Sequence, residues 1–481
     1  MKAFKISTLA VLIMGTVAGC TRGFEEINTN DNAPISVQPE FLLRQVVYDL
    51  GEQMSYEGFV AGNLLGQYFT AIDFNLFDRH SLTEPQFGGN PWPVLYRNLR
   101  DNETLLALAR ENSVYAVYEG PALVMKAYIG AMLTDLYGDV PYFGAVSGKA
   151  GAVTPVYDAQ RDIYLAQGGI LDNLETAISL MDNYSGTQAL QGDILYGGQL
   201  QGWVGFAHSL LIKSLLRISG TEEVSAQLQA LANTAGYIQD NGANAAYDFT
   251  DGQPNNFRMA NLRAGDFNLF VMSETMQEVT EALNDPRAGV LFRPADNFPG
   301  EYRGLLNGPD ASQTSISVAD YSLTGTIFRE ETGRLDASFI TAWETSFLLA
   351  EAAERGLITG DAQAYYEQGV AQAFAYWGLE LPADYLTTGN ATYGANGADP
   401  IEQIITQKWL AHCVNGYEGW GEYRRTGFPA LKTISASLNN DLIPVRLPYP
   451  ADEQALNREN YEAATAENGN SINAPVWWDQ E

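Results

Sequence analysis

The sequence predicts a mostly α protein in which paired helices form a scaffold for long irregular loops. Apolar residues recur every three or four positions over many segments, which is typical of helices that bury one face. The clearest example is residues 162–181, where Ile163, Ile170, Leu174 and Met181 fall on one helical face. The intervening segments are rich in glycine, asparagine, aspartate and proline, which favour turns and loops. No alternation of strand and helix patterns suggests a parallel sheet.

A series of segments carries the helical pattern, and neighbouring segments are expected to pair as hairpins. In chain order they are residues 39–68, 95–112, 114–137, 162–181, 203–218, 222–239, 271–284, 338–356, 361–378 and 400–415. Such hairpins have the size of tetratricopeptide-like units, although the sequence lacks a clean repeat of roughly 34 residues. The long loops between them are residues 70–94, 186–201, 241–270, 286–336 and 382–399. Loops of this length are unusual inside a compact domain and often carry function, so we expect binding residues there.

The first twenty residues have the order of a secretory signal followed by a lipid attachment site. Lys2 and Lys5 give a positive start, Leu9 to Met14 form an apolar run, and small residues precede Cys20. The run is too short to span a bilayer, which needs about 20 apolar residues, and the whole pattern is typical of a secretory signal. Residues 17–20 resemble a bacterial lipobox, which implies cleavage before Cys20 and acylation of that cysteine. The alternative is an ordinary signal peptide followed by a chance cysteine.

Composition and charge indicate a globular protein whose acidic surface should repel nucleic acid. Hydrophobic residues make up 46% of the chain and charged residues 18%, as in ordinary folded domains. The net charge of −31 becomes −33 once the signal is removed with Lys2 and Lys5, so the surface should repel nucleic acid and anionic headgroups. If Cys20 is lipidated, Cys413 is the only other cysteine and no intrachain disulfide is possible.

The usual sequence signatures of enzymes are missing. His80, His208 and His412 are the only histidines and lie far apart, with no HExxH motif and no zinc-ligand spacing. There is no nucleophile elbow, phosphate-binding loop or strand-linked glycine fingerprint. Asp240 and Asp251 flank an Asn- and Gly-rich stretch, but the closing glutamate of a calcium loop is absent. We therefore expect no enzymatic activity, no cofactor and no metal site. A pair of catalytic carboxylates remote in sequence is the remaining alternative.

Several segments, in the right order along the chain, match the signatures of one family. Residues 134–142 (TDLYGDVPY) resemble its YGD(I/V)PY motif, and residues 24–30 (FEEINTN) resemble its opening segment. Further matches are residues 347–353 (FLLAEAA), 360–362 (GDA), 407–409 (QKW), 419–420 (GW), 423–427 (YRRTG), 443–446 (IPVR), 449–450 (YP), Glu453 and 477–479 (WWD). On these residues the chain resembles the SusD/RagB family of nutrient-binding outer-membrane lipoproteins.

The resemblance implies a fold and a function. The SusD-like fold would place four tetratricopeptide-like helical pairs under an irregular, loop-built region. The function would be capture of glycan by a non-catalytic lipoprotein on the cell surface, which passes it to a SusC-like TonB-dependent outer-membrane transporter. The alternatives are binding of peptide or another nutrient, a surface glycan hydrolase, and a purely structural lipoprotein. The expected organisation is a signal peptide at 1–19, a lipid anchor and tether at 20–37, and a SusD-like domain at 38–481.

Two departures from the family pattern concern the segment that follows the anchor. Asp31 stands where the family usually has proline, a minor change in a turn. Glu25 and Glu26 come late after Cys20, and an earlier acidic run would better support export to the outer surface. Which face of the outer membrane the protein occupies therefore stays open at this point.

Most residues of the matching motifs are expected to serve the scaffold. Residues 137–141 should end a helix, since glycine and then proline are good terminators. Arg424 and Arg425 should pair with buried acids, and His412 and Cys413 should pack. The tryptophans in helical contexts should be core residues, namely Trp203, Trp343, Trp409 and Trp420.

Ligand-binding residues are expected in the loops instead. Sugars present apolar C–H faces and many hydroxyls, so their sites combine an aromatic platform with oriented polar groups. The leading candidate is the first loop, residues 68–92, with Tyr68, Asp73, Phe74, Asn75, Phe77, Asp78, Arg79, Gln86, Asn90 and Trp92. Second choices are Asn255, Asn256, Phe257, Arg258, Asn261 and Arg263, and then Phe298, Tyr302, Arg303 and Asn307. The alternative is that these aromatic residues only anchor their own loops.

Overall fold

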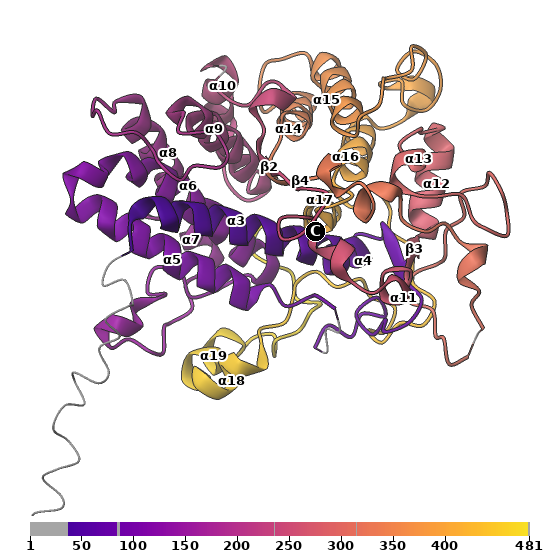
Figure 1. Cartoon of the computed structure of the whole chain (residues 1–481), viewed down its shortest axis with the longest axis horizontal. Coiled ribbons are helices and arrows are strands. Elements are labelled where there is room, and N and C mark those ends of the chain that lie inside the picture. Colours follow the sequence, from indigo (N-terminus) through magenta and orange to yellow (C-terminus); the bar gives the residue numbers. More distant parts are fainter. Residues whose placement is uncertain (1–36, 84–86, 235, 314, 480–481) are drawn as a thin grey trace, which may run out of the picture. The chain divides into compact units, whose positions relative to one another are not determined.

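The computed structural model describes residues 37–479 except 84–86, 235 and 314 (Figure 1). The signal peptide, the lipidation site at Cys20 and the tether up to residue 36 lie outside the described residues, as does Gln86. Residues Pro39–Glu481 form one compact unit.

The first half of this unit is built from consecutive helices that pack against one another. Helix α3 packs on α5, α5 on α6, α6 on α8, and α8 on α9. These helices run from indigo to magenta in Figure 1. Their bounds are α3 (Pro39–Glu57), α4 (Asn63–Leu65), α5 (Trp92–Glu111), α6 (Glu119–Tyr137), α7 (Gln160–Leu165), α8 (Ile170–Asp182), α9 (Leu200–Arg217) and α10 (Ser225–Thr234).

The second half mixes long irregular segments with further helices. Helix α14 packs on α9, α15 and α16, and α16 packs on α17. The bounds are α11 (Ala264–Phe267), α12 (Glu274–Leu283), α13 (Ala288–Leu291), α14 (Ala342–Glu354), α15 (Ala362–Tyr376), α16 (Pro400–Ala411), α17 (Gly416–Thr426), α18 (Ala451–Leu456) and α19 (Arg458–Ala464).

Within the residues that the structure describes, two small antiparallel sheets connect loops that are distant in sequence. Strand β1 (Phe69–Ala71) pairs with β3 (Phe270–Met272), with Phe69 opposite Met272. Strand β2 (Ala245–Asp248) pairs with β4 (Asp336–Ile340). The pairing of β1 with β3 holds the start of the first loop, residues 68–92, beside the segment that leads into α12.

The prediction of a mostly α, helical-pair scaffold with long loops is confirmed, and the differences have local causes. The expected helix 39–68 changes at Glu57 into a π-helical turn over Gly58–Gly62, where α17 packs so closely that a side chain at Gly62 would meet the backbone of Tyr417. The expected helix 162–181 is divided near Gly168, whose φ of +77° does not suit a helix. In the described part of the chain, no helix is long and apolar enough to cross a membrane.

Most scaffold predictions for the family motifs are also confirmed. Helix α6 ends at Tyr137, and Gly138 caps it. His412 and Cys413 are buried. The four tryptophans Trp203, Trp343, Trp409 and Trp420 are each no more than 2% exposed.

A network of buried charges joins α9, α14, α16 and α17. Lys213 Nζ lies 2.9 Å from Glu344 and 2.8 Å from Glu418. Arg217 contacts Glu418 at 3.0 Å and Glu422 at 3.3 Å. Because buried charges are tolerated only when they are paired, this network fixes how the four helices meet.

The two arginines of the YRRTG motif behave differently from each other. Arg425 pairs with Glu351 at 2.6 Å, which confirms the prediction that it meets a buried acid. Arg424 donates to the carbonyl oxygens of Asp135 and Val445, at 2.8 and 2.9 Å. Arg424 also interacts electrostatically with the buried carboxylate of Asp479. Its guanidinium also lies 4.1 Å from the ring centre of Trp420, so it contributes by cation–π contact as well.

The network predicts a steep loss of stability in acid. Burial alone would raise the pKa of Glu418, but Lys213 and Arg217 lower it to about 2, from an ordinary value of 4.5. Such a carboxylate stabilises the fold above pH 4.5, and that stability is lost as the pH falls toward 2.

Between pH 7 and pH 4.5, different buried groups have opposite effects on the stability of the fold. Burial lowers the pKa of His412 and of His80 to about 4, so acidification destabilises the fold through these histidines. Burial raises the pKa of Asp78 to about 7 and that of Asp336 to about 6, so acidification stabilises the fold through these carboxyls. We therefore expect a thermal midpoint that changes little from pH 7 to 4.5 and then falls steeply. A midpoint that rises below pH 4.5 would contradict this assignment.

Candidate functional site

The structure buries four of the aromatic rings that the sequence suggested as sugar platforms. Tyr68 is fully buried, donates its hydroxyl to the Trp409 carbonyl at 2.7 Å and stacks on the Trp409 ring with centres 4.3 Å apart. Phe77 and Phe257 are core residues. Trp92 is 7% exposed, and its ring lies edge-on to Tyr137 at 4.9 Å. Protein side chains cover these rings, so they support the loops rather than offer a face to a ligand.

Several polar residues of the first loop fasten that loop to residues 307–310. Asn75 donates to the carbonyl oxygens of Ala71 and Pro309, at 3.1 and 2.6 Å. Asp78 accepts hydrogen bonds from Asn307 at 2.6 Å and from the Gly308 amide at 2.8 Å. These groups satisfy one another in the interior, which is the expected state of buried polar groups. Their role is to hold the loop.

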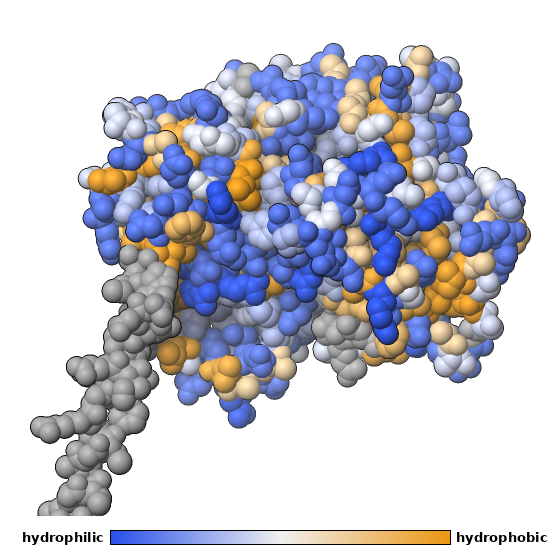
Figure 2. Space-filling view, viewed as in Figure 1, coloured by the Kyte–Doolittle hydropathy of each residue, from blue (hydrophilic) through white to orange (hydrophobic). Residues whose placement is uncertain are grey.

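Among the other first-loop candidates, Asp73 and Phe74 are exposed and Arg79 is half-buried. Asp73 is exposed and accepts a hydrogen bond from the Phe74 amide. Phe74 is 52% exposed, with its ring edge-on to Phe87 at 6.0 Å. Arg79 donates Nε to the Ala436 carbonyl at 2.9 Å. Figure 2 shows a mainly hydrophilic face on which hydrophobic residues gather around β3 and α11, near the strand pair that begins this loop.

The candidates of the segment 255–263 are mostly engaged within the protein. Arg258 lies 4.4 Å from the ring centre of Tyr56 and hydrogen-bonds Gln53. The amides of Asn256 and Asn261 bond to each other at 3.0 Å. Asn255 accepts from Tyr48, and Arg263 pairs with Asp266.

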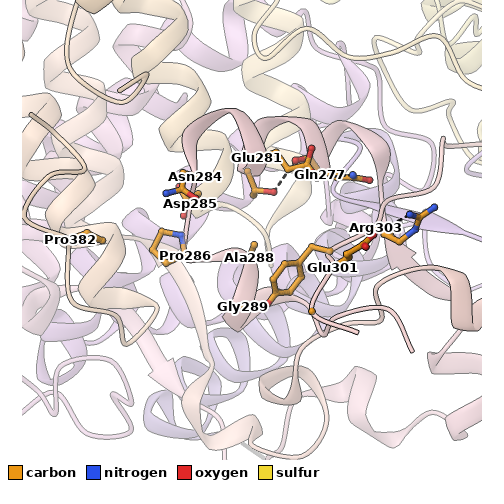
Figure 3. A pocket seen from close by; sticks show the side chains of 13 residues that line it. Gln277, Glu281, Asn284, Asp285, Pro286, Ala288, Gly289, Glu301, Arg303 and Pro382 are labelled. Atoms are coloured by element: carbon orange, nitrogen blue, oxygen red, sulfur yellow. Dashed lines mark hydrogen bonds and ion pairs between the residues drawn. The ribbon is translucent and has the colours of Figure 1, made fainter. Parts of the chain in front are cut away.

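Tyr302 and Arg303, from the third candidate segment, line a large open cavity. Its volume is about 750 Å³, within the range of small-molecule sites. Figure 3 shows side chains of α12 on one side and the segment that carries Glu301 and Arg303 on another. We call this space the first cavity. Its lining residues are Gln277, Thr280, Glu281, Asn284, Asp285, Pro286, Ala288, Gly289, Gly300, Glu301, Tyr302, Arg303 and Pro382.

Two polar side chains of the first cavity are available to a ligand. Within the described residues, the Asn284 amide and the Tyr302 hydroxyl have no hydrogen-bond partner. Arg303 pairs with Glu301 at 3.3 Å and lies 3.9 Å from the ring centre of Phe298, which fixes its guanidinium at the edge of the cavity. The cavity thus combines an aromatic ring, an amide, a hydroxyl and a guanidinium.

Hydrogen bonds and an ion pair hold two of the residues that line the first cavity, Gln277 and Asp285. Gln277 donates to Glu281 at 2.8 Å and accepts from the Gly304 amide at 2.6 Å, which holds α12 against the segment before Asn307. Asp285 is held by Arg287 at 2.6 Å. Burial alone would raise the pKa of Asp285, but Arg287 keeps it below its usual range, so this wall carries a compensated charge.

Sequence reasoning missed the α12 wall. Gln277, Glu281 and Asn284 lie three or four residues apart, which makes a polar stripe on a predicted helix. Such stripes usually face solvent and bind no ligand, so the sequence does not show that this stripe lines a cavity. The structure shows it, because the segment that carries Glu301 and Arg303 lies opposite the stripe.

Comparison with known proteins decides the family. A SusD-like family model, described as "Starch-binding associating with outer membrane", matches residues 31–450. The chain belongs to the SusD-like family. The resemblance deduced from the motifs is therefore confirmed, and the family description is one of starch binding in association with the outer membrane.

Solved structures show the same SusD-like fold. A SusD homologue from Bacteroides fragilis has a TM-score of 0.80 at 22% identity, covering 92% of this chain and all of that one. A chitin-binding protein has a TM-score of 0.78 at 24% identity, with the same coverage. A chitin-binding SusD homologue from Flavobacterium johnsoniae has a TM-score of 0.76 at 21% identity, covering 92% of this chain and 98% of that one. No curated protein matches the sequence.

Proposed function

We propose that this SusD-like protein captures neutral glycan at the outer membrane and that the first cavity holds the sugar. The observation that carries the proposal is the convergence of Tyr302, Asn284 and Arg303 on one open cavity of about 750 Å³. The tyrosine ring suits the C–H face of a pyranose, while the amide and the guanidinium suit its hydroxyls. Starch is named by the family description, and chitin by two of the structural relatives, so α-glucans and chitin are the first ligands to test.

The proposal places the protein in an uptake complex. The lipobox at residues 17–20 supports attachment through Cys20, and the family supports an outer-membrane location, with the binding domain on the cell surface. The protein then hands glycan to a SusC-like TonB-dependent transporter without cleaving it. Detergent extraction followed by pull-down should recover a transporter barrel. Incubation with a bound oligosaccharide should leave it intact, and shorter products would overturn the non-catalytic role.

Tyr302→Ala is expected to weaken glycan binding by about 1–3 kcal/mol, the range for losing an aromatic-sized apolar contact. Affinity electrophoresis in gels that contain starch or glycol chitin should show less retardation of the variant. Tyr302 is only partly buried, so the thermal midpoint should change little.

The matched variant is Phe74→Ala, which removes the exposed ring of the first loop. It should leave retardation unchanged if the first cavity is the site. If Phe74→Ala abolishes retardation and Tyr302→Ala does not, the first loop holds the glycan. If no glycan retards the wild type but calorimetry detects binding of a peptide mixture, the nutrient is peptide.

A further inference from the structure

A second cavity lies against the same helix as the first. Its volume is about 430 Å³, and it is bounded by α12, the loop that carries Asn396, the start of α16, and Pro429 with Ala430. Nothing in the proposed function above uses this cavity.

The two cavities occupy opposite flanks of α12. Gln277, Thr280 and Glu281 of α12 line the first cavity, whereas Val279, Ala282 and Leu283 line the second. Since successive residues of an α-helix are about 100° apart, these two sets point to opposite sides. Leu283 and Asn284 are consecutive in sequence and line different cavities, so the cavities come together at the C-terminal end of the helix.

The surface between the cavities is exposed at Glu278, Glu281 and Ala282. Glu278 pairs with Lys432, and the Ala282 carbonyl accepts a hydrogen bond from Asn390, so the path across the helix runs over the Ala282 methyl group beside these contacts. The distance to be crossed is roughly the 10 Å diameter of a helix. An extended chain molecule can therefore lie across α12 with one part in each cavity.

The second cavity has chemistry that suits sugar. Throughout the part of the chain that the structure describes, the side chains of Asn396, Glu402 and Thr406 have no hydrogen-bond or ion-pair partner. Gln403, by contrast, is fully engaged, accepting from the Gly394 amide and donating to the Asn390 and Thr392 carbonyls. The remaining wall is largely apolar, with Leu283 and Pro429. Spare polar groups beside apolar surface match the hydroxyls and C–H faces of a saccharide.

We infer that the second cavity is a second saccharide subsite and that one glycan chain occupies both cavities by crossing α12. This inference rests on the proposed function of the first cavity. Once one part of a chain is bound in the first cavity, binding of the next part becomes intramolecular and gains a high effective concentration. The protein therefore selects polymeric glycan over short oligosaccharides. Among the described residues, the second cavity is lined by Glu402 and by no lysine or arginine, so its preferred ligand is neutral rather than acidic.

The test compares chain lengths in the wild type and in a second-cavity variant. Calorimetry with maltose and maltoheptaose, and with chitobiose and chitohexaose, should show at least tenfold tighter binding of the long member of the pair that binds. The variant is Asn396→Gly with Glu402→Ala, at two exposed positions. Glycine tolerates the positive φ of 59° at residue 396, so the fold should be kept.

The variant should lose about tenfold in affinity for the long chain and bind the short one unchanged. Glu111→Ala, an exposed acid on α5, is the matched control and should alter neither affinity. Equal affinity of the wild type for both lengths would overturn the inference while leaving the proposed function intact. The inference would also be overturned if the variant kept the wild-type affinity for the long chain, or if it lost affinity equally for both lengths. Absence of binding to every oligosaccharide would overturn both proposals.

Discussion

Glu422→Gln is expected to reduce the free energy of unfolding by about 3–5 kcal/mol, the usual effect of breaking a buried ion pair by removing one partner. Glu422 is 2% exposed and lies 3.1 Å from Lys408 and 3.3 Å from Arg217. It also accepts a hydrogen bond from Arg425. Glutamine keeps the shape but removes the charge, so cations of α9, α16 and α17 lose a shared carboxylate in a site that water does not reach. Urea unfolding followed by circular dichroism measures the loss.

The matched control is Glu462→Gln. Glu462 pairs with Arg458 at 2.7 Å, but both side chains are more than half exposed. Exposed pairs contribute about 0–1 kcal/mol, so this variant should unfold almost as the wild type does. A loss below about 1 kcal/mol for Glu422→Gln, similar to the control, would contradict a structural role for the buried network.

Much of the scaffold could be predicted because its signals are local. The spacing of apolar residues identifies α8, and the glycine after Tyr137 identifies the end of α6, without knowledge of any distant contact. Helix α17 was not predicted. Its residues Gly416, Gly419 and Gly421 are poor helix formers. Close packing against Gly62 explains why glycine is needed at 416, and close packing against Tyr68 explains it at 419.

The candidate site was harder to predict because burial depends on partners far away in sequence. Tyr68 and Phe74 are both aromatic residues of the first loop, yet only Tyr68 meets a partner 341 residues later, Trp409, that buries it. The composition of a loop does not distinguish these cases. Tyr302 was found because an aromatic residue beside an arginine suggests a site. Asn284 was missed, because its role exists only where α12 faces the segment that carries Tyr302.

Trp92→Ala is expected to destabilise the fold by about 3–5 kcal/mol, the range for removing a large aromatic side chain from a core. The sequence alone places Trp92 among the candidate ligand-binding residues, which would predict weaker ligand binding with little change in stability. The structure surrounds the indole with Tyr96 at 4.7 Å, Tyr137 at 4.9 Å and Tyr449 at 6.0 Å between ring centres. Truncation leaves a cavity that these rings cannot fill without leaving their own positions. Urea unfolding of the full domain measures the effect.

Phe74→Ala gives the comparison that separates the two roles within one loop. Its ring is 52% exposed against 7% for Trp92, so its removal forfeits little burial and should change stability by less than about 0.5 kcal/mol. If Trp92→Ala instead keeps the wild-type midpoint and weakens retardation by glycan, the indole contacts ligand and the first loop is the site. If the midpoint falls and the folded fraction still binds glycan, Trp92 stabilises the loop and does not contact the ligand. This result would agree with glycan binding in the first cavity.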